Sequence, residues 1–180
     1  MNEQQTKNVV YLIGCATPNV TQFVELIPLL QAADWDVCVI LTPQATRFAD
    51  SVRLAELTGH PVRSDYKRPG DPDTLPRADA LLVYPATFNT LNKWALGISD
   101  TLALGLLCEL TGLKVPILAI PVVRKGGGLD LHPAFKRSLR ILQRCGVHML
   151  YEPDRYPPRN EVPSTRIVEA VREMMPREHA

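Results

Sequence analysis

The sequence has almost no net charge and no long apolar run, and both absences exclude classes of protein. It has 20 Lys and Arg residues against 19 Asp and Glu residues, for a formal net charge of +1. No basic block exceeds a pair such as Lys67-Arg68, so we expect neither a nucleic acid nor an acidic membrane surface as partner. No segment approaches the roughly 18 uninterrupted apolar residues of a membrane span.

Cysteine is sparse and its spacing is not that of a metal or redox motif. The four cysteines lie far apart without a C-x-x-C pair, which predicts free thiols in a reducing cytoplasm and no metal site: Cys15, Cys38, Cys108 and Cys145. The segment from Leu12 to Cys15 looks like a lipoprotein cleavage site. The apolar run before it, Val9 to Ile13, is shorter than the roughly 7–15 residues that a secretory signal needs. A cytoplasmic protein is therefore expected.

The common nucleotide motifs are also missing. There is no G-x-G-x-x-G and no Walker lysine, so a dinucleotide or nucleoside triphosphate is not indicated. Small residues at Gly14 to Thr17 do separate a strand pattern from a helix pattern. Backbone N–H groups and the helix dipole can bind a phosphate in such a turn. A tight strand-to-helix turn without a ligand explains these residues equally well.

What the sequence does contain is an alternation of strand and helix patterns along 180 residues. With 46% apolar residues this length fits one domain, residues 1–180. Strands are predicted near Val62 and, as apolar runs, at 9–13, 37–41, 80–83, 116–120 and 147–150. The alternation predicts an α/β fold: a three-layer, doubly wound parallel sheet of Rossmann-like or flavodoxin-like type with right-handed crossovers.

The stretch from Ala78 to Cys108 is the most informative part of the chain. Ala80 to Val83 is an apolar run without alternation, typical of a strand buried on both faces, and Pro85 is expected to stop it. Thr87 is placed to cap the helix that follows, and Ser99 with Asp100 to cap the next one. That second helix is apolar nearly all round, so we expect it to pack against another subunit as well as its own sheet.

The residues after this strand resemble a known motif. The segment Pro85-Ala86-Thr87-Phe88-Asn89-Thr90 is similar to the Pro-Ala-Ser-Ala-Asn-Thr motif of the flavin-containing cysteine decarboxylases, a family that includes phosphopantothenoylcysteine decarboxylases and flavin prenyltransferases. Lys93 to Asp100 resembles the family's helix–Gly–Ile–(Ala/Ser)–Asp continuation. The resemblance covers most of residues 9–150 and implies a flavoprotein with FMN as cofactor. It also implies that the protein assembles as a trimer or a larger oligomer, with the FMN near the contact between subunits.

The resemblance also implies which residues bind the flavin. They lie in the turn after the first strand, after the second strand, in the matched motif and after the strand at 116–120: Gly14, Cys15, Ala16, Thr17, Thr42, Pro85, Ala86, Thr87, Asn89, Thr90 and Arg124. Thr42 has the alternative role of an ordinary helix cap. Arg124 suits a phosphate or carboxylate, and its alternative is a solvated surface charge.

The chain departs from the family at its catalytic positions. The family's catalytic His falls on Asp71, which is either a replacement base or an exposed turn aspartate. Arg124 stands where decarboxylases have an Asn, and the crossing segment 152–163 lacks the Cys of the phosphopantothenoylcysteine enzymes. His132 is a candidate donor to the substrate, although a lone His before a helix more often has no chemical role. The catalytic candidates are therefore Asp71, Arg124 and His132.

Three functions remain open at this stage. The first is an FMN-dependent lyase that oxidatively decarboxylates a cysteine-containing or other small acidic substrate, either a small molecule or a peptide. The second is a flavin prenyltransferase, for which Arg124 is the pointer to a prenyl phosphate. The third is an FMN-binding subunit without chemistry, with a regulatory or assembly role.

Overall fold

The computed structural model describes residues 7–72 and 74–175. Its centre is one sheet of five parallel strands in the order β2-β1-β3-β4-β5. The strands are β1 (Asn8–Gly14), β2 (Trp35–Leu41), β3 (Ala80–Ala86), β4 (Ile117–Pro121) and β5 (His148–Met149). The predicted doubly wound parallel sheet is confirmed, and the strand order is the flavodoxin-like one.

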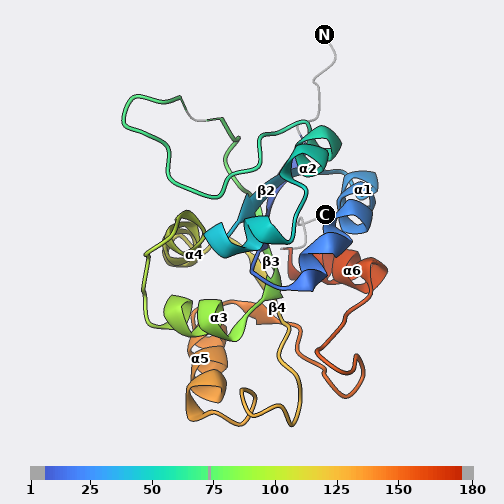
Figure 1. Cartoon of the computed structure of the whole chain (residues 1–180), viewed down its shortest axis with the longest axis vertical. Coiled ribbons are helices and arrows are strands. Elements are labelled where there is room, and N and C mark those ends of the chain that lie inside the picture. Colours follow the sequence, from blue (N-terminus) through green and yellow to red (C-terminus); the bar gives the residue numbers. More distant parts are fainter. Residues whose placement is uncertain (1–6, 73, 176–180) are drawn as a thin grey trace, which may run out of the picture.

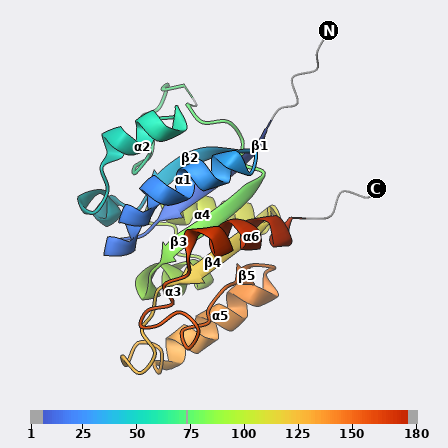
Figure 2. The ribbon, with the colours of Figure 1, turned by 90° about the vertical axis from the view of Figure 1, so that its right-hand side faces the viewer.

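Helices cover both faces of the sheet, which gives three layers. Figure 1 shows α1 and α6 on one side of the strands and α3, α4 and α5 on the other, and Figure 2 gives the perpendicular view. The α-helices are α1 (Phe23–Ala32), α2 (Ser51–Thr58), α3 (Phe88–Ala95), α4 (Leu102–Gly112), α5 (Pro133–Arg144) and α6 (Ser164–Met174). Two short 3-10 helices follow the first two strands: η1 (Pro18–Gln22) and η2 (Pro43–Arg47).

The core follows from the alternation of side chains along buried strands. In β1, Val10 and Leu12 pack with α1 and α6, whereas Tyr11 and Ile13 pack with α3, α4 and α5. Both faces of the strand are therefore apolar, which is why its sequence reads as a continuous apolar run.

Two sequence expectations about the strands need correction. The strand predicted near Val62 is reduced to a single bridge, in which the Arg63 N–H donates to Val39 O at 3.1 Å and Arg63 O accepts from the Leu41 N–H at 2.8 Å. Pro61 before it has no N–H to donate, and the polar residues that follow offer little apolar surface to bury against the sheet, so no longer strand forms. Pro85 does not stop β3, because a proline at this strand end keeps its carbonyl for pairing.

The cap of α4 also differs from the prediction. Thr101, rather than Ser99 or Asp100, is the N-cap, and its hydroxyl accepts from the Leu104 N–H at 3.3 Å. Asp100 instead pairs with Lys93. Thr87 caps α3 as predicted, accepting from the Thr90 N–H at 3.4 Å. Among the residues described, no helix is long and apolar enough to cross a membrane.

Candidate functional site

The candidate site lies at the carboxyl ends of β1 and β3. These strands are neighbours, but β1 leads to α1 on one face of the sheet and β3 leads to α3 on the other, so the sheet has its topological switch point between them. Open α/β sheets bind ligands in the crevice outside such a point. A backbone hydrogen bond from Cys15 N to Pro85 O at 3.2 Å joins the ends of β1 and β3, and one from Val122 N to Ala86 O at 3.0 Å joins the end of β4 to β3.

One cleft at this edge has four threonines in its lining. This threonine cleft has a volume of about 460 Å³ and is lined by Ala16, Thr42, Pro43, Gln44, Thr87, Asn89, Thr90, Lys93, Thr101 and Leu104. Thr87 and Thr101 begin α3 and α4, so two helix N-termini border the cleft, and Lys93 adds a positive charge that Asp100 partly neutralises. Together these groups favour the binding of an anion.

A second cleft adjoins the first, and more large apolar side chains line it. This glycine-loop cleft has a volume of about 600 Å³ and is lined by Thr17, Thr87, Phe88, Asn89, Val122, Val123, Arg124, Gly127, Leu129 and Arg159. Thr87 and Asn89 line both clefts, so one elongated ligand can extend from one into the other. The arrangement suits a molecule with an anionic end and a flat, largely apolar body.

Four of the sequence-predicted cofactor residues lie beneath the clefts rather than in their lining. Gly14, Cys15, Pro85 and Ala86 are buried. A Cβ on Gly14 would lie 2.8 Å from the Leu41 side chain and 3.0 Å from the Phe23 ring, so packing within the protein accounts for this glycine. The other seven predicted residues line one cleft or both: Ala16, Thr17, Thr42, Thr87, Asn89, Thr90 and Arg124.

The Cys15 thiol lies below the threonine cleft and is fully buried. Burial raises its pKa, and hydrogen bonding with Thr90 and Thr87 offsets only part of that effect. Cys15 is therefore a neutral thiol that supports the floor of the cleft.

The predicted catalytic residues Asp71 and His132 lie outside the linings of both clefts. Asp71 is in the loop 59–79, where its carboxylate accepts from the Arg68 N–H at 3.0 Å, and it lines a separate hollow that shares no residue with the two clefts. His132 is exposed and caps α5, with Nδ1 accepting from the Ala134 N–H at 3.1 Å. Its ring meets Phe88 edge-on, with centroids 5.6 Å apart, so it borders the glycine-loop cleft.

Sequence reasoning missed several residues of the site. Lys93 and Thr101 lie within or next to the stretch that resembles the family, so their closeness in sequence to the matched motif could have indicated that they belong to the site. Arg159 had no such signal, because it lies in the Pro-rich crossing segment far along the chain. Among the described residues there is no cluster of His, Cys, Asp and Glu that could hold a metal ion.

Comparison with known proteins gives this geometry a family. The model of the flavoprotein family matches residues 1–172. The chain is 30% identical over 123 residues to the coenzyme A biosynthesis bifunctional protein of Bacillus subtilis, covering 65% of this chain and 29% of that protein. It is 33% identical over 103 residues to a cysteine/cysteine sulfinic acid decarboxylase of an unknown prokaryote, covering 54% and 27%. The chain thus spans less than a third of the length of these two relatives.

Solved structures show the same fold at low sequence identity. The FMN-dependent cysteine decarboxylase SpaF superposes with a TM-score of 0.74 at 20% identity, covering 94% of this chain and 98% of the other. The FMN-binding protein AtHal3 gives a TM-score of 0.74 at 20% identity, covering 93% and 96%. With the family model matching almost the whole chain, this protein belongs to the flavoprotein family.

Proposed function

We propose that the chain binds FMN at the carboxyl edge of its sheet and acts on a cysteine-containing or other small acidic substrate, from which it releases CO2. The observation that carries the proposal is the meeting of the threonine cleft and the glycine-loop cleft at Thr87 and Asn89, on the switch point of a flavodoxin-like sheet. Relatives named as cysteine decarboxylases support the reaction class.

The residues present fit FMN. Its phosphate would be held in the threonine cleft, where hydroxyls, Lys93 and two helix N-termini favour a negative charge. Its ring system would be held by the apolar side chains of the glycine-loop cleft, such as Phe88 and Val122. When bound, FMN supplies a two-electron sink: a thiol substrate loses two electrons and two protons to it, after which the substrate carboxylate leaves as CO2.

Proton transfer is the step for which this chain offers the fewest groups. Within the described part of the chain, neither cleft lining contains a His, Asp or Glu. His132 beside the glycine-loop cleft accepts the Ala134 N–H at Nδ1, which leaves Nε2 as the protonated nitrogen of the neutral ring. In this geometry His132 is a hydrogen-bond donor to a substrate carboxylate rather than a base.

The cofactor proposal is tested by titrating FMN and following the quenching of flavin fluorescence. Thr42→Val is the informative variant, because the Thr42 hydroxyl makes no cap hydrogen bond and the variant should keep its fold. Loss of one neutral hydrogen bond should weaken FMN binding by about three- to tenfold. Thr46→Val is the matched control, since Thr46 is exposed on the same short helix and lines neither cleft. Equal affinity of both variants would contradict this placement of the cofactor.

The reaction is tested separately with the FMN-loaded protein. Anaerobic bleaching of the flavin by a peptide ending in Cys, together with CO2 release, would support decarboxylation.

A flavin prenyltransferase is the second candidate, favoured by the two arginines at the edge of the glycine-loop cleft. Consumption of dimethylallyl phosphate in the presence of reduced FMN would support it. Turnover of neither substrate would favour the FMN-binding subunit without chemistry.

We also propose that the chain assembles as a trimer or larger. On α4, Leu102, Leu106 and Cys108 are only partly buried, and Leu96 and Ile98 before that helix are exposed. An apolar surface of this kind is typical of a subunit contact. Light scattering at micromolar concentration measures the assembly directly, and a monomer would contradict the proposal.

A further inference from the structure

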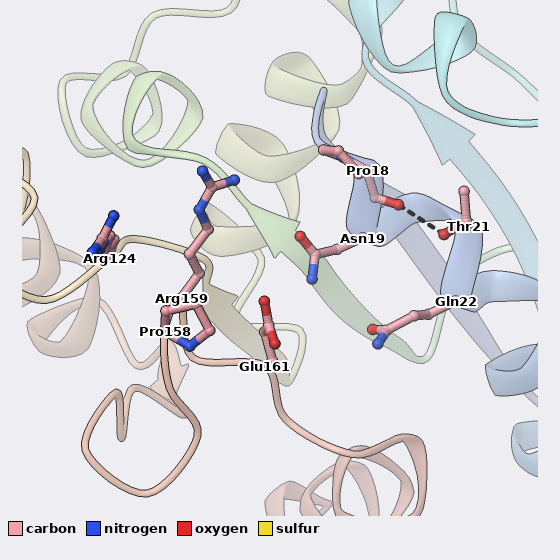
Figure 3. A pocket seen from close by; sticks show the side chains of 8 residues that line it. All are labelled: Pro18, Asn19, Thr21, Gln22, Arg124, Pro158, Arg159 and Glu161. Atoms are coloured by element: carbon pink, nitrogen blue, oxygen red, sulfur yellow. Dashed lines mark hydrogen bonds between the residues drawn. The ribbon is translucent and has the colours of Figure 1, made fainter.

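A third hollow lies beside the glycine-loop cleft and has two arginines in its wall. This arginine hollow has a volume of about 540 Å³ and is lined by Pro18, Asn19, Thr21, Gln22, Arg124, Pro158, Arg159 and Glu161 (Figure 3). Arg124 and Arg159 also line the glycine-loop cleft, so the two spaces share their positively charged wall. A ligand in the glycine-loop cleft can therefore extend a group to both guanidinium ions.

The two arginines come from distant parts of the chain; their side chains are exposed, and a buried side chain ties together the backbone segments that carry them. Arg124 follows β4, whereas Arg159 lies in the crossing segment 152–163 between β5 and α6. Asn160, which is fully buried, donates from Nδ2 to Pro121 O at 3.0 Å and to Leu150 O at 2.8 Å, and its Oδ1 accepts from the Glu152 N–H at 2.8 Å. These bonds fix the backbone next to Arg159 relative to the end of β4, so that both arginine side chains begin at the same edge of the hollow.

Neither arginine is neutralised by the protein. Within residues 7–72 and 74–175, the guanidinium groups of Arg124 and Arg159 have no hydrogen-bond or ion-pair partner, whereas Arg155 and Lys125 of the same region pair with Glu152 and Asp154. Two guanidinium ions on one concave wall repel each other, and an anion between them removes that repulsion. Their planar, forked donors match the oxygens of a carboxylate or phosphate.

The opposite wall of the hollow supplies neutral donors. The Tyr84 hydroxyl donates to Gln22 Oε1, and the Thr17 hydroxyl donates to Asn19 Oδ1 at 3.3 Å. The oxygen of each amide therefore accepts from within the protein, and the NH2 group of Gln22 is left to donate to a ligand, whereas Asn19 also bonds to the Tyr84 hydroxyl. Figure 3 shows both amides on the side of the hollow that faces Arg159 and Glu161. Glu161 is the one carboxylate in the lining, against two arginines.

We propose that the arginine hollow is a subsite for the oxyanion of the substrate, a carboxylate or a phosphate remote from the reacting group, held by Arg124 and Arg159. The proposal rests on the proposed function, because it assigns the glycine-loop cleft to the cofactor ring and the reacting end of the substrate. It deepens that function by giving the substrate a second acidic group. Glu161 then limits the subsite to ligands whose negative charge lies on the arginine side.

The test measures the binding of inorganic phosphate and of glutarate by calorimetry, with the FMN-loaded protein and with the protein free of FMN. Arg159→Gln should weaken the tighter of the two probes by about tenfold, as the loss of a charge-assisted hydrogen bond implies. Arg155→Gln is the matched control, because it removes the same charge from the same segment but lies outside the hollow, and it should change affinity less than twofold. Glu161→Gln should tighten binding by removing the negative charge.

Each outcome decides the proposal. Equal losses in Arg159→Gln and Arg155→Gln, or no effect of Glu161→Gln, would overturn it. Loss of phosphate binding when FMN is loaded would also overturn it, because the hollow would then hold the cofactor's own phosphate. Preference for phosphate or for glutarate identifies which oxyanion the substrate carries. Should the protein fail to quench FMN fluorescence, the proposed function fails, while an Arg159-dependent probe affinity would still support the subsite.

Discussion

Two long connections of this chain, the loop 59–79 and the crossing segment 152–163, are polar and carry charged side chains, but they are held in different ways. The carboxylate of Asp71 in the loop is held by a turn of its own, accepting from the Arg68 N–H three residues away. Arg159 in the crossing segment stands next to Asn160, whose side chain bonds to carbonyls 39 and 10 residues away. Figure 1 shows the loop extending away from α3 and α5.

The difference indicates where in this fold a charged side chain can have a defined task. A side chain on a segment anchored in the core keeps its position relative to the strand ends, as a binding group requires. A side chain on a segment held by local, exposed contacts keeps its position only relative to its own turn. The anchored residues Asn160, Tyr84 and Thr87 should therefore respond strongly to mutation, and Asp71 weakly.

The largest effect is expected for Asn160→Ala. The substitution removes three hydrogen bonds and leaves two carbonyls and one N–H unpaired in the interior, so we expect a loss of about 3 kcal/mol in the free energy of unfolding. Urea denaturation measures it. Asn89→Ala is the control, because Asn89 is exposed, and it should stay within about 0.5 kcal/mol of the wild type. Similar stabilities of the two variants would show that the crossing segment is not anchored as described.

Tyr84 should make the protein sensitive to alkali. Burial raises the pKa of its hydroxyl to about 12, whereas in the unfolded chain it titrates near 10. Above about pH 10 the unfolded state loses this proton first, so stability is full below that pH and falls by about 2 to 3 kcal/mol as the pH rises to about 12. Denaturation at a series of pH values measures the slope. In Tyr84→Phe the free energy of unfolding should fall less over this pH range, by about the same 2 to 3 kcal/mol. An unchanged pH dependence would show that the Tyr84 hydroxyl is not its source.

A smaller effect is expected for Thr87→Ala at the start of α3. The variant loses the N-cap hydrogen bond to Thr90, which should cost about 1 kcal/mol of stability. Thr87→Ser keeps a hydroxyl at the same place and should retain most of the stability. A loss of the same size in both variants would mean that the threonine methyl group, rather than the cap, is what matters.

The smallest effect is expected for Asp71→Ala. Asp71 is exposed and its carboxylate bonds only within its turn, so stability should change by no more than about 0.5 kcal/mol. The FMN affinity of the Asp71→Ala variant, measured by fluorescence quenching, should equal that of the wild type. A variant that binds FMN normally but loses turnover would make Asp71 a catalytic base and would contradict this expectation.

The sequence predicted the parts of the fold that local patterns determine. The runs 9–13 and 80–83 predicted β1 and β3 because a strand buried on both faces needs apolar side chains at successive positions. The resemblance placed Thr42, Thr87 and Asn89 correctly at one sheet edge, while their role toward FMN stays a prediction. The pairing of Arg159 with Arg124 depends on a buried contact between Asn160 and Pro121, and no local pattern encodes such a long-range contact.

The burial of Cys15 has a consequence for a protein that would carry an oxidant. An FMN placed as proposed, with its phosphate in the threonine cleft and its ring system in the adjoining glycine-loop cleft, would lie close to this thiol, and a thiolate there would compete with the substrate as electron donor to the flavin. Cys15 is fully enclosed and its raised pKa keeps the sulfur protonated, so it is a poor reductant at neutral pH. If the chain binds FMN as proposed, burial of Cys15 would protect this sulfur from oxidation and leave the oxidising capacity of the cofactor for a thiol that arrives from solution.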